Sequence, residues 1–230
     1  MAYRVNEIFY SLQGEGYWTG RPAVFVRLSG CNLRCPWCDT DFQSYREMSA
    51  DDICAEATKL LRDALGDNNT PFPNPLQDLP QPSLAFPQPL LVLTGGEPSL
   101  QADAALIHAL HQAGFYIAIE TNGTHPLPDG IDWVCCSPKE GSRVILHQAD
   151  EVKVVFTDTD PEHWRTSLTA RHYYLQPLDS GLKNNAEDSA PQTNATNSAS
   201  RNNAKETIRY IQSHPWWRLS LQTHKLTGIR

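Results

Sequence analysis

The sequence lacks any apolar run long enough to cross a bilayer. No stretch approaches the roughly 20 consecutive apolar residues that a transmembrane helix needs. The first residues, Met1–Glu7, also lack the long apolar segment of a secretory signal peptide. We therefore expect a soluble cytoplasmic protein that does not bind membranes.

Basic residues are scarce relative to acidic ones. The chain has 19 Lys and Arg against 26 Asp and Glu, which gives a formal net charge of −7. An acidic surface repels phosphate backbones, so we expect no nucleic-acid partner. In a cytoplasmic chain, the six cysteines indicate metal ligands, catalysts or core residues before they indicate disulfides.

Two segments differ in composition from the rest of the chain. Residues 67–89 hold seven of the 17 prolines, which exclude a long helix or a central strand there. Residues 180–204 are rich in Asn and Ser and contain no aromatic residue, so we expect this segment to be disordered. Because the pattern on both sides of each segment is the same, we interpret both as insertions in a single domain spanning residues 1–230.

Short apolar runs alternate with amphipathic segments along the chain. The apolar runs predict strands at 23–28, 90–94, 116–120, 133–137, 151–156 and 173–176, and the amphipathic segments predict helices at 49–65, 102–113 and 201–214. This alternation favours an α/β protein with a parallel sheet. Polar, glycine-rich or cysteine-rich clusters follow five of the strands, and in barrels the carboxyl ends of the strands converge on one active-site mouth.

Three cysteines, Cys31, Cys35 and Cys38, lie within eight residues. A structural zinc site requires four ligands, and a ferredoxin-like cluster requires four thiolates. A cubane held by three thiolates instead leaves one iron open for a substrate, which is a catalytic arrangement. Cys54 could supply a fourth ligand, but its apolar helical neighbours favour a role in the core.

The segment CNLRCPWCD, residues 31–39, resembles the CxxxCxxC signature of the radical S-adenosylmethionine (SAM) enzymes, and GGEP at 95–98 resembles their second motif. A closer resemblance, to the 7-carboxy-7-deazaguanine synthase family, is carried by YSLQGEGYWTGRPAVFVRLSG, LTGGEPSL, IETNGTH, CCSPK, YLQP and RLSLQTHKLTGIR. It spans nearly the whole chain and skips the two insertions.

This resemblance implies a fold, a reaction and a set of cofactors. The fold would be an abbreviated (β/α)6-type partial TIM barrel of the radical SAM kind, in a homodimer. The reaction would convert 6-carboxy-5,6,7,8-tetrahydropterin into 7-carboxy-7-deazaguanine with loss of ammonia, on the route to 7-cyano-7-deazaguanine (preQ0) and queuosine. The cofactors would be a [4Fe–4S] cluster, SAM and Mg²⁺, and an electron donor such as flavodoxin would reduce the cluster.

The resemblance also implies the site residues. Cys31, Cys35 and Cys38 would ligate the cluster, and Thr40 would hold Mg²⁺ beside the substrate carboxylate. SAM would contact Trp37, Cys38, Asp39, Gly96, Ser137, Pro138, Lys139, Gln176, Pro177, Leu178 and Asp179. The pterin substrate would contact Leu12, Gln13, Gly14, Glu15, Arg27, Thr94, His224 and Arg230.

Arg27 stands out even without the resemblance, because it interrupts an apolar strand. A buried guanidinium requires an anion, which could be a substrate carboxylate or a structural salt-bridge partner.

Two rival functions remain open from the sequence. A short radical SAM activase would make a glycyl radical on a partner protein, but it would lack the LQGEG and LQTHK segments. A non-catalytic iron–sulfur or zinc protein would require neither GGEP nor SPK.

Overall fold

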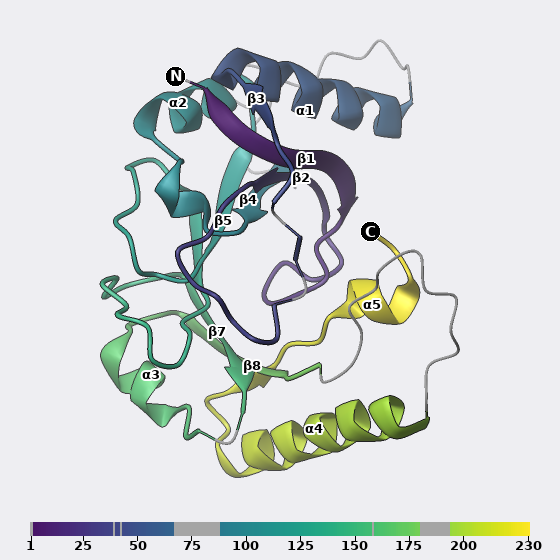
Figure 1. Cartoon of the computed structure of the whole chain (residues 1–230), viewed down its shortest axis with the longest axis vertical. Helices are drawn as coiled ribbons and strands as arrows, with labels where there is room; N and C mark the ends of the chain where they lie inside the picture. The colour runs from purple at the N-terminus through teal and green to yellow at the C-terminus, as the bar shows by residue number, and fades with distance from the viewer. Residues whose placement is uncertain (1, 39, 42, 67–87, 158, 180–193) are drawn as a thin grey trace, which may run out of the picture.

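The computed structural model describes residues 2–38, 40–41, 43–66, 88–157, 159–179 and 194–230 (Figure 1). Most of the proline-rich insertion and the first part of the second insertion therefore lie outside the described residues, as does the predicted SAM contact Asp39. None of the described helices is both long and apolar enough to cross a membrane.

One mixed sheet organises the described residues, with strand order β3-β1-β2-β4-β5-β6-β7-β8-β9. Its central six strands run parallel: β2 (Pro22–Leu28), β4 (Leu90–Gly95), β5 (Tyr116–Thr121), β6 (Trp133–Cys136), β7 (Glu151–Phe156) and β8 (His172–Pro177). These match the six strands predicted from the apolar runs to within two residues. Six parallel strands with crossover helices form the expected partial barrel.

The three remaining strands lie at the two edges of the sheet and were not predicted. They are β1 (Tyr3–Leu12), antiparallel to β2; β3 (Arg46–Met48), antiparallel to β1; and β9 (Arg218–Leu219), parallel to β8. Strand β1 has no apolar run because several of its side chains are only partly buried. Strands near an edge carry this mixed pattern, which a search for apolar runs overlooks.

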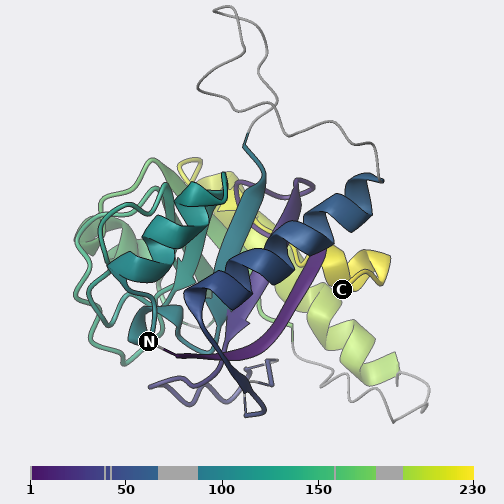
Figure 2. The same cartoon turned by 90° about the horizontal axis from the view of Figure 1, so that it is seen from above.

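The described helices are α1 (Ala50–Leu65), α2 (Ala104–Gln112), α3 (Glu162–Ser167), α4 (Asn194–Ser213) and α5 (Thr223–Thr227), with a 3₁₀ turn at Pro98–Leu100. Helices α1 to α4 cover the outer face of the sheet, and the short α5 lies beside a cavity. Figures 1 and 2 show α1 and α2 together over one half of the sheet and α4 beside the other half. Helix α1 begins where predicted, at Ser49, which forms a reciprocal capping box with Asp52.

Helix α4 corrects one expectation from the sequence. It begins at Asn194, so residues 194–204, which were expected to be disordered, are helical. No proline follows Pro191 in this stretch, and its alanines are strong helix formers. The helix continues into the buried residue Thr207 and the packed residue Tyr210, which anchor its second half on the sheet.

Alternation along the strands divides the core into an outer and an inner layer. On β2, Val24 and Val26 pack with residues of α1 and α2, whereas Ala23 and Phe25 pack inside the barrel with Trp133 of β6. Successive strand side chains point to opposite faces. Arg27 and Thr94, which are Cα partners across β2 and β4, therefore belong to the inner layer.

The connection between β1 and β2 lies at the amino-terminal ends of the parallel strands, where Leu12 pairs with Pro22. It then turns back into the barrel, so that Gly16 lies against the buried carboxylate of Glu151 on β7. No Cβ would fit at Gly16, whose φ is 67°. The glycine therefore lets this loop enter the barrel from the end opposite the mouth.

Candidate functional site

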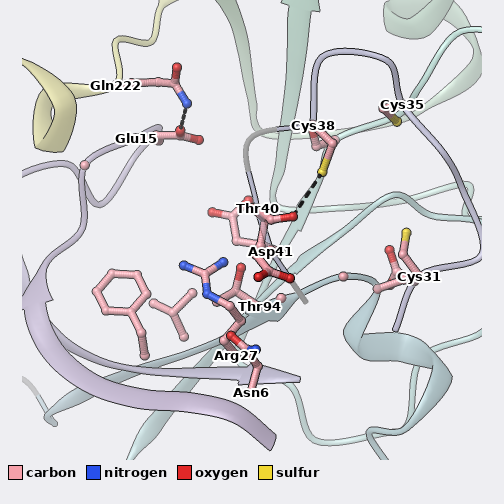
Figure 3. A pocket seen from close by; sticks show the side chains of 18 of the residues that line it. Asn6, Glu15, Arg27, Cys31, Cys35, Cys38, Thr40, Asp41, Thr94 and Gln222 are labelled. Carbon is pink, nitrogen blue, oxygen red and sulfur yellow. Dashed lines mark hydrogen bonds between the residues drawn. The ribbon is translucent and has the colours of Figure 1, made fainter. Parts of the chain in front are cut away.

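A cavity of about 1570 Å³ opens at the carboxyl ends of the parallel strands (Figure 3). This volume exceeds the usual range for one small ligand, about 300–1,000 Å³, and has room for two. Among the described residues, every site residue implied by the sequence lines this cavity except Pro138, which is buried behind Ser137 and Lys139. Residues from both ends of the chain therefore meet at one place.

The cluster loop, defined as the described residues of 29–45, carries the three motif cysteines. Their thiols are free, and Figure 3 shows them along one wall of the cavity. The Leu33 amide donates to Cys31 Sγ at 3.4 Å, and Cys38 Sγ donates to the Thr40 carbonyl oxygen at 3.8 Å. Burial raises the pKa of the Cys31 and Cys35 thiols, so ligation would release their protons.

The spacing of these thiols tests which metal group fits. Within the described part of the chain, no three His, Cys, Asp or Glu side chains converge closely enough to hold a single metal ion. Three thiolates on three irons of a cubane lie farther apart than three ligands of one ion. The open cavity beside the thiols therefore suits a [4Fe–4S] cluster with one free iron better than a closed zinc site.

The GGEP motif packs directly against the cluster loop. A Cβ on Gly96 would collide with the Gly30 carbonyl oxygen, and the Glu97 amide donates to that same oxygen at 2.8 Å. Gly95 has a φ of 126° and touches the Leu28 backbone. Both glycines are thus required for strand β4 to pass close behind the cysteine motif.

Glu97 is almost fully buried and acts as a connector between motifs. Its carboxylate accepts hydrogen bonds from Thr121 Oγ1 at 2.6 Å and from the amides of Asn122 and Ser99 at 2.7 and 3.0 Å. The Asn122 side chain in turn donates to Asn32 Oδ1 in the cluster loop at 3.1 Å. These bonds tie the β4 and β5 ends to the residue that follows the first cysteine.

Arg27 has both an internal partner and access to the cavity. Its Nε donates to Glu7 Oε1 at 2.7 Å, and Arg230 pairs with the other oxygen of the same carboxylate. Figure 3 shows the guanidinium pointing into the cavity beside Thr94. Glu7 therefore holds Arg27 from its side, and the two terminal nitrogens face the space where a ligand carboxylate would bind.

The opposite wall of the cavity is a dense network that we call the carboxylate floor. It consists of Lys153, which is 5% exposed, the carboxylates of Glu15 and Glu120, and the amides of Gln13, Gln176 and Gln222. Lys153 Nζ lies 2.8 Å from Glu15 Oε2 and 3.0 Å from Glu120 Oε2. Burial alone would raise the pKa of Glu15, but Lys153 and the amide donors outweigh it and lower the pKa to about 2.

The C-terminal segment, defined as residues 222–230, covers one side of the cavity. Thr223 Oγ1 donates to the Gly14 carbonyl oxygen at 2.9 Å, and Ser11 Oγ donates to the Arg230 carbonyl oxygen at 2.6 Å. The His224 imidazole lies so close to Gly14 that no Cβ would fit there. The segment thus spans the open side of the sheet between the end of β1 and β8.

The predicted SAM side lies beyond β6 and β8. Lys139 Nζ donates to Ser137 Oγ at 2.6 Å and sits 5.3 Å from the centre of the Trp37 ring. Burial lowers the pKa of Lys139. Lys225 Nζ donates to Asp179 Oδ2 at 3.0 Å, which fixes the residues after β8 against α5.

Glu120 was expected at this mouth, because it ends a predicted strand, whereas three residues that bond the predicted site residues were not predicted: Glu7, Lys153 and Gln222. A signal for Lys153 was present, because it interrupts an apolar strand as Arg27 does. No comparable signal marks Glu7, which lies in a strand of mixed polarity. The contribution of Gln222 depends on how the C-terminal segment folds back over the barrel.

The chain was also compared with known proteins. No family model matches the chain. It is similar to proteins named 7-carboxy-7-deazaguanine synthase from Bacteroides thetaiotaomicron, at 44% identity over 230 residues, and from Bordetella pertussis, at 39% over 242, with all of both chains covered in each case. Among solved structures, QueE from Escherichia coli aligns with a TM-score of 0.67 and 25% identity, covering 96% of this chain and 94% of that one.

Proposed function

The chain belongs to the 7-carboxy-7-deazaguanine synthase family of radical SAM enzymes, which act in the biosynthesis of preQ0 and queuosine, and we propose how its cavity performs that reaction. The substrate is 6-carboxy-5,6,7,8-tetrahydropterin, and the product is 7-carboxy-7-deazaguanine with loss of ammonia. One observation carries the proposal: the three free cysteines and the Arg27 guanidinium face each other across one cavity large enough for SAM and a pterin.

Cys31, Cys35 and Cys38 hold the [4Fe–4S] cluster as thiolates in this proposal. When bound, the cluster and SAM would supply the radical chemistry that the reaction needs. Trp37, Gly96, residues 137–139 and residues 176–179, which line the cavity or flank its lining, would hold SAM there. Asp39, the remaining predicted contact, lies outside the described residues.

The pterin lies between Arg27 and the carboxylate floor. Arg27 binds the substrate carboxylate with its two terminal nitrogens, and Thr40 would help hold a Mg²⁺ ion, since Mg²⁺ prefers oxygen ligands. Leu12, Gln13, Gly14, Glu15, Thr94 and His224 contact the ring system, and Arg230 closes its outer side. The C-terminal segment keeps bulk water away from the bound substrate, which protects a radical from side reactions.

Three further features belong to the same proposal. The enzyme acts in the cytoplasm as a homodimer of single-domain chains, with residues 67–89 and 180–204 as insertions. A reduced carrier protein such as flavodoxin donates the electron. Both the dimer and the donor follow from the family resemblance.

The decisive experiment is turnover by the reconstituted protein. After anaerobic reconstitution with iron and sulfide, the enzyme is incubated with SAM, dithionite, Mg²⁺ and the carboxytetrahydropterin. We expect 7-carboxy-7-deazaguanine and ammonia in equal amounts, measured by mass spectrometry and an ammonia assay. Because loss of ammonia balances the reaction without an oxidant, SAM is regenerated and turnover should leave its amount unchanged. SAM cleavage without this product would reject the assigned substrate, and the absence of both the product and reductive SAM cleavage would reject the radical SAM assignment.

A further inference from the structure

Lys153 is a buried cation to which the proposed mechanism gives no task. It lies on β7 between Val152 and Val154, which face the outer core, and its own side chain faces the cavity. Enclosing an ammonium in protein costs several kcal/mol unless its protons are well paired. An apolar residue would fill the position at lower cost, so the charge itself calls for an explanation.

The pairing is specific, because one ammonium holds two carboxylates from different elements. Glu15 comes from the β1–β2 loop and Glu120 from β5, and each bonds Lys153 Nζ through its Oε2 atom. The far oxygen of Glu15 accepts from Gln222 at 2.9 Å and from Gln176 at 3.3 Å. The far oxygen of Glu120 accepts from Gln13 at 3.3 Å.

These bonds fix both carboxylates without exhausting them. An ionised carboxylate offers about four acceptor positions. Glu120 uses three of these in its bonds to Lys153, to Gln13 and to the Cys135 thiol, and both Glu15 and Glu120 line the cavity. Each carboxylate is therefore held at both oxygens by the protein while it borders the space where a ligand binds.

We propose that Lys153 is a positioning residue that keeps Glu15 and Glu120 ionised and at a fixed separation, so that together they accept hydrogen bonds from the N–H groups of the pterin. A pterin presents such donors at its ring nitrogen and its exocyclic amino group. This inference rests on the proposed function and deepens it. It assigns recognition of the heterocycle to a carboxylate pair that one cation holds together.

The electrostatics of the floor explain why the cation is required. Two carboxylates that share a buried site without a cation cannot both stay ionised, and one of them takes a proton. A protonated carboxyl would donate where the pterin also donates. With Lys153 present, burial is outweighed and the pKa of Glu15 falls to about 2, so Glu15 remains an acceptor at neutral pH.

Other titratable groups face Lys153 from the elements packed around it. They are Cys135 on β6, Glu151 on β7, Lys139 after β6, Tyr174 on β8 and, beside Glu15, His224 on α5. Burial raises the pKa of the Cys135 thiol well above its usual value, so this thiol is neutral. Burial also raises the pKa of Glu151 to about 7. Glu15 and Glu120 are thus the two anions that bond the ammonium directly.

The test compares Lys153→Met, Lys153→Arg and the control Lys59→Met, which removes an exposed lysine of α1. Each reconstituted variant is assayed for KM, for kcat and for the Kd of pterin-6-carboxylate, between about pH 6 and pH 9. For Lys153→Met we expect KM and Kd to rise roughly 10- to 100-fold near pH 7, the loss of a hydrogen bond to a charged group. The difference in KM and Kd from wild type should shrink as the pH rises, because Glu15 and Glu120 then lose the proton that they share in the absence of a cation.

Lys153→Arg should keep the wild-type pH dependence, because its charge remains, and Lys59→Met should match wild type throughout. A KM for Lys153→Met within twofold of wild type would overturn the inference. So would a deficit of equal size at every pH, which would indicate a purely structural role. Wild-type protein that makes no product would instead reject the proposed function.

A double variant covers the case in which Lys153→Met does not fold. Lys153→Met with Glu120→Gln removes one carboxylate together with the cation, so no like-charged pair remains. We expect this variant to bind pterin-6-carboxylate weakly, with a smaller pH dependence than Lys153→Met because only one of the two carboxylates remains. Wild-type affinity, or a pH dependence as large as that of Lys153→Met, would overturn the inference.

Discussion

The cluster loop and the carboxylate floor face each other across the same cavity but are built differently. The described residues of the loop form no helix or strand, and Cys38 is exposed while Cys31 and Cys35 are half-buried. The floor is formed by strand and loop residues whose polar atoms bond one another, and Lys153 and Gln176 are buried. One wall presents unused ligand atoms, whereas the other presents atoms already fixed by the protein.

This difference shows how the protein divides the task of binding. A preorganised floor loses little conformational entropy when a substrate binds, which favours selective recognition. The cysteine wall acquires its bonds from the cofactor, so its geometry depends on what is bound. Substitutions in the loop should therefore act through cofactor content, and substitutions around the floor should act through substrate affinity or stability.

The largest effect is expected for Cys35→Ala. Loss of one thiolate should remove the cluster and bring turnover below detection, while the free energy of unfolding changes by no more than about 0.5 kcal/mol. Iron and sulfide analysis measures cluster content, product formation measures turnover, and urea titration followed by circular dichroism measures the free energy of unfolding. Cys54→Ala on α1 is the matched control and should keep a full cluster. A Cys35→Ala protein with a complete [4Fe–4S] complement would contradict the three-ligand assignment.

Arg27→Met should weaken substrate binding without changing cofactor binding. Removing a bidentate partner of the carboxylate should raise the pterin KM about 100-fold with cluster content and SAM binding unchanged, because each charge-assisted hydrogen bond contributes about 1.5–3 kcal/mol. Steady-state kinetics and equilibrium dialysis with SAM check this. Arg62→Met, an exposed position on α1, should have no effect. Loss of the cluster in Arg27→Met would instead show that the two walls are not independent.

Glu97→Gln tests the connection behind the cluster loop. Both carboxylate oxygens of Glu97 accept hydrogen bonds, one from Thr121 and Ser99 and the other from Asn122. In the Gln variant, the NH₂ group would replace one of these oxygens and place a donor against a donor. We expect a loss of about 2–3 kcal/mol in the free energy of unfolding, measured by urea titration. The exposed Glu206→Gln should lose less than about 0.5 kcal/mol. Equal stability of the two variants would show that Glu97 does not hold this region together.

Glu151→Gln should change how stability depends on pH. Burial raises the pKa of Glu151 to about 7 from its usual 4.5, so the native state binds this proton more tightly than the unfolded state does. The stabilisation of the native state by this proton is fully present below about pH 4.5 and is lost as the pH rises through 7. The fall in unfolding free energy between about pH 5.5 and 8.5 should be smaller by about 1–2 kcal/mol in Glu151→Gln than in wild type. An identical fall in both proteins would exclude Glu151 as its source.

The sequence predicted much of the cysteine wall and less of the floor. The spacing of Cys31, Cys35 and Cys38, together with GGEP after a strand, is local information, and the structure keeps these segments together. The six parallel strands were also predicted, because buried strands are apolar runs. The strand β1 and the first turns of α4 were missed because their composition is polar.

Gln13, Glu15 and Gln176 of the floor were predicted as ligand contacts, but the bonds that join them to Lys153 and Gln222 could not be predicted, because these residues come from distant elements. Gln13 and Glu15 enter the barrel from the amino-terminal ends of the parallel strands. The sequence predicted the site at the opposite end, where the strands finish. Arg27 was singled out as a cation in an apolar strand, yet Lys153 shows the same pattern and was passed over. The resemblance to a family supplied a role for Arg27 and none for Lys153.

The long sequence separations within the floor also bear on how the molecule is made. Gln13 bonds a residue 107 positions away, and Glu15 bonds one 207 positions away, so these contacts form late in folding. At a synthesis rate of about 5–20 residues per second, the ribosome needs roughly 10–40 s to go from Cys38 to Gln222. During that interval the three cysteines have been synthesised, but the wall that will enclose their thiols is incomplete. Cluster insertion after release of the finished chain would avoid a long exposure of bound iron to oxygen.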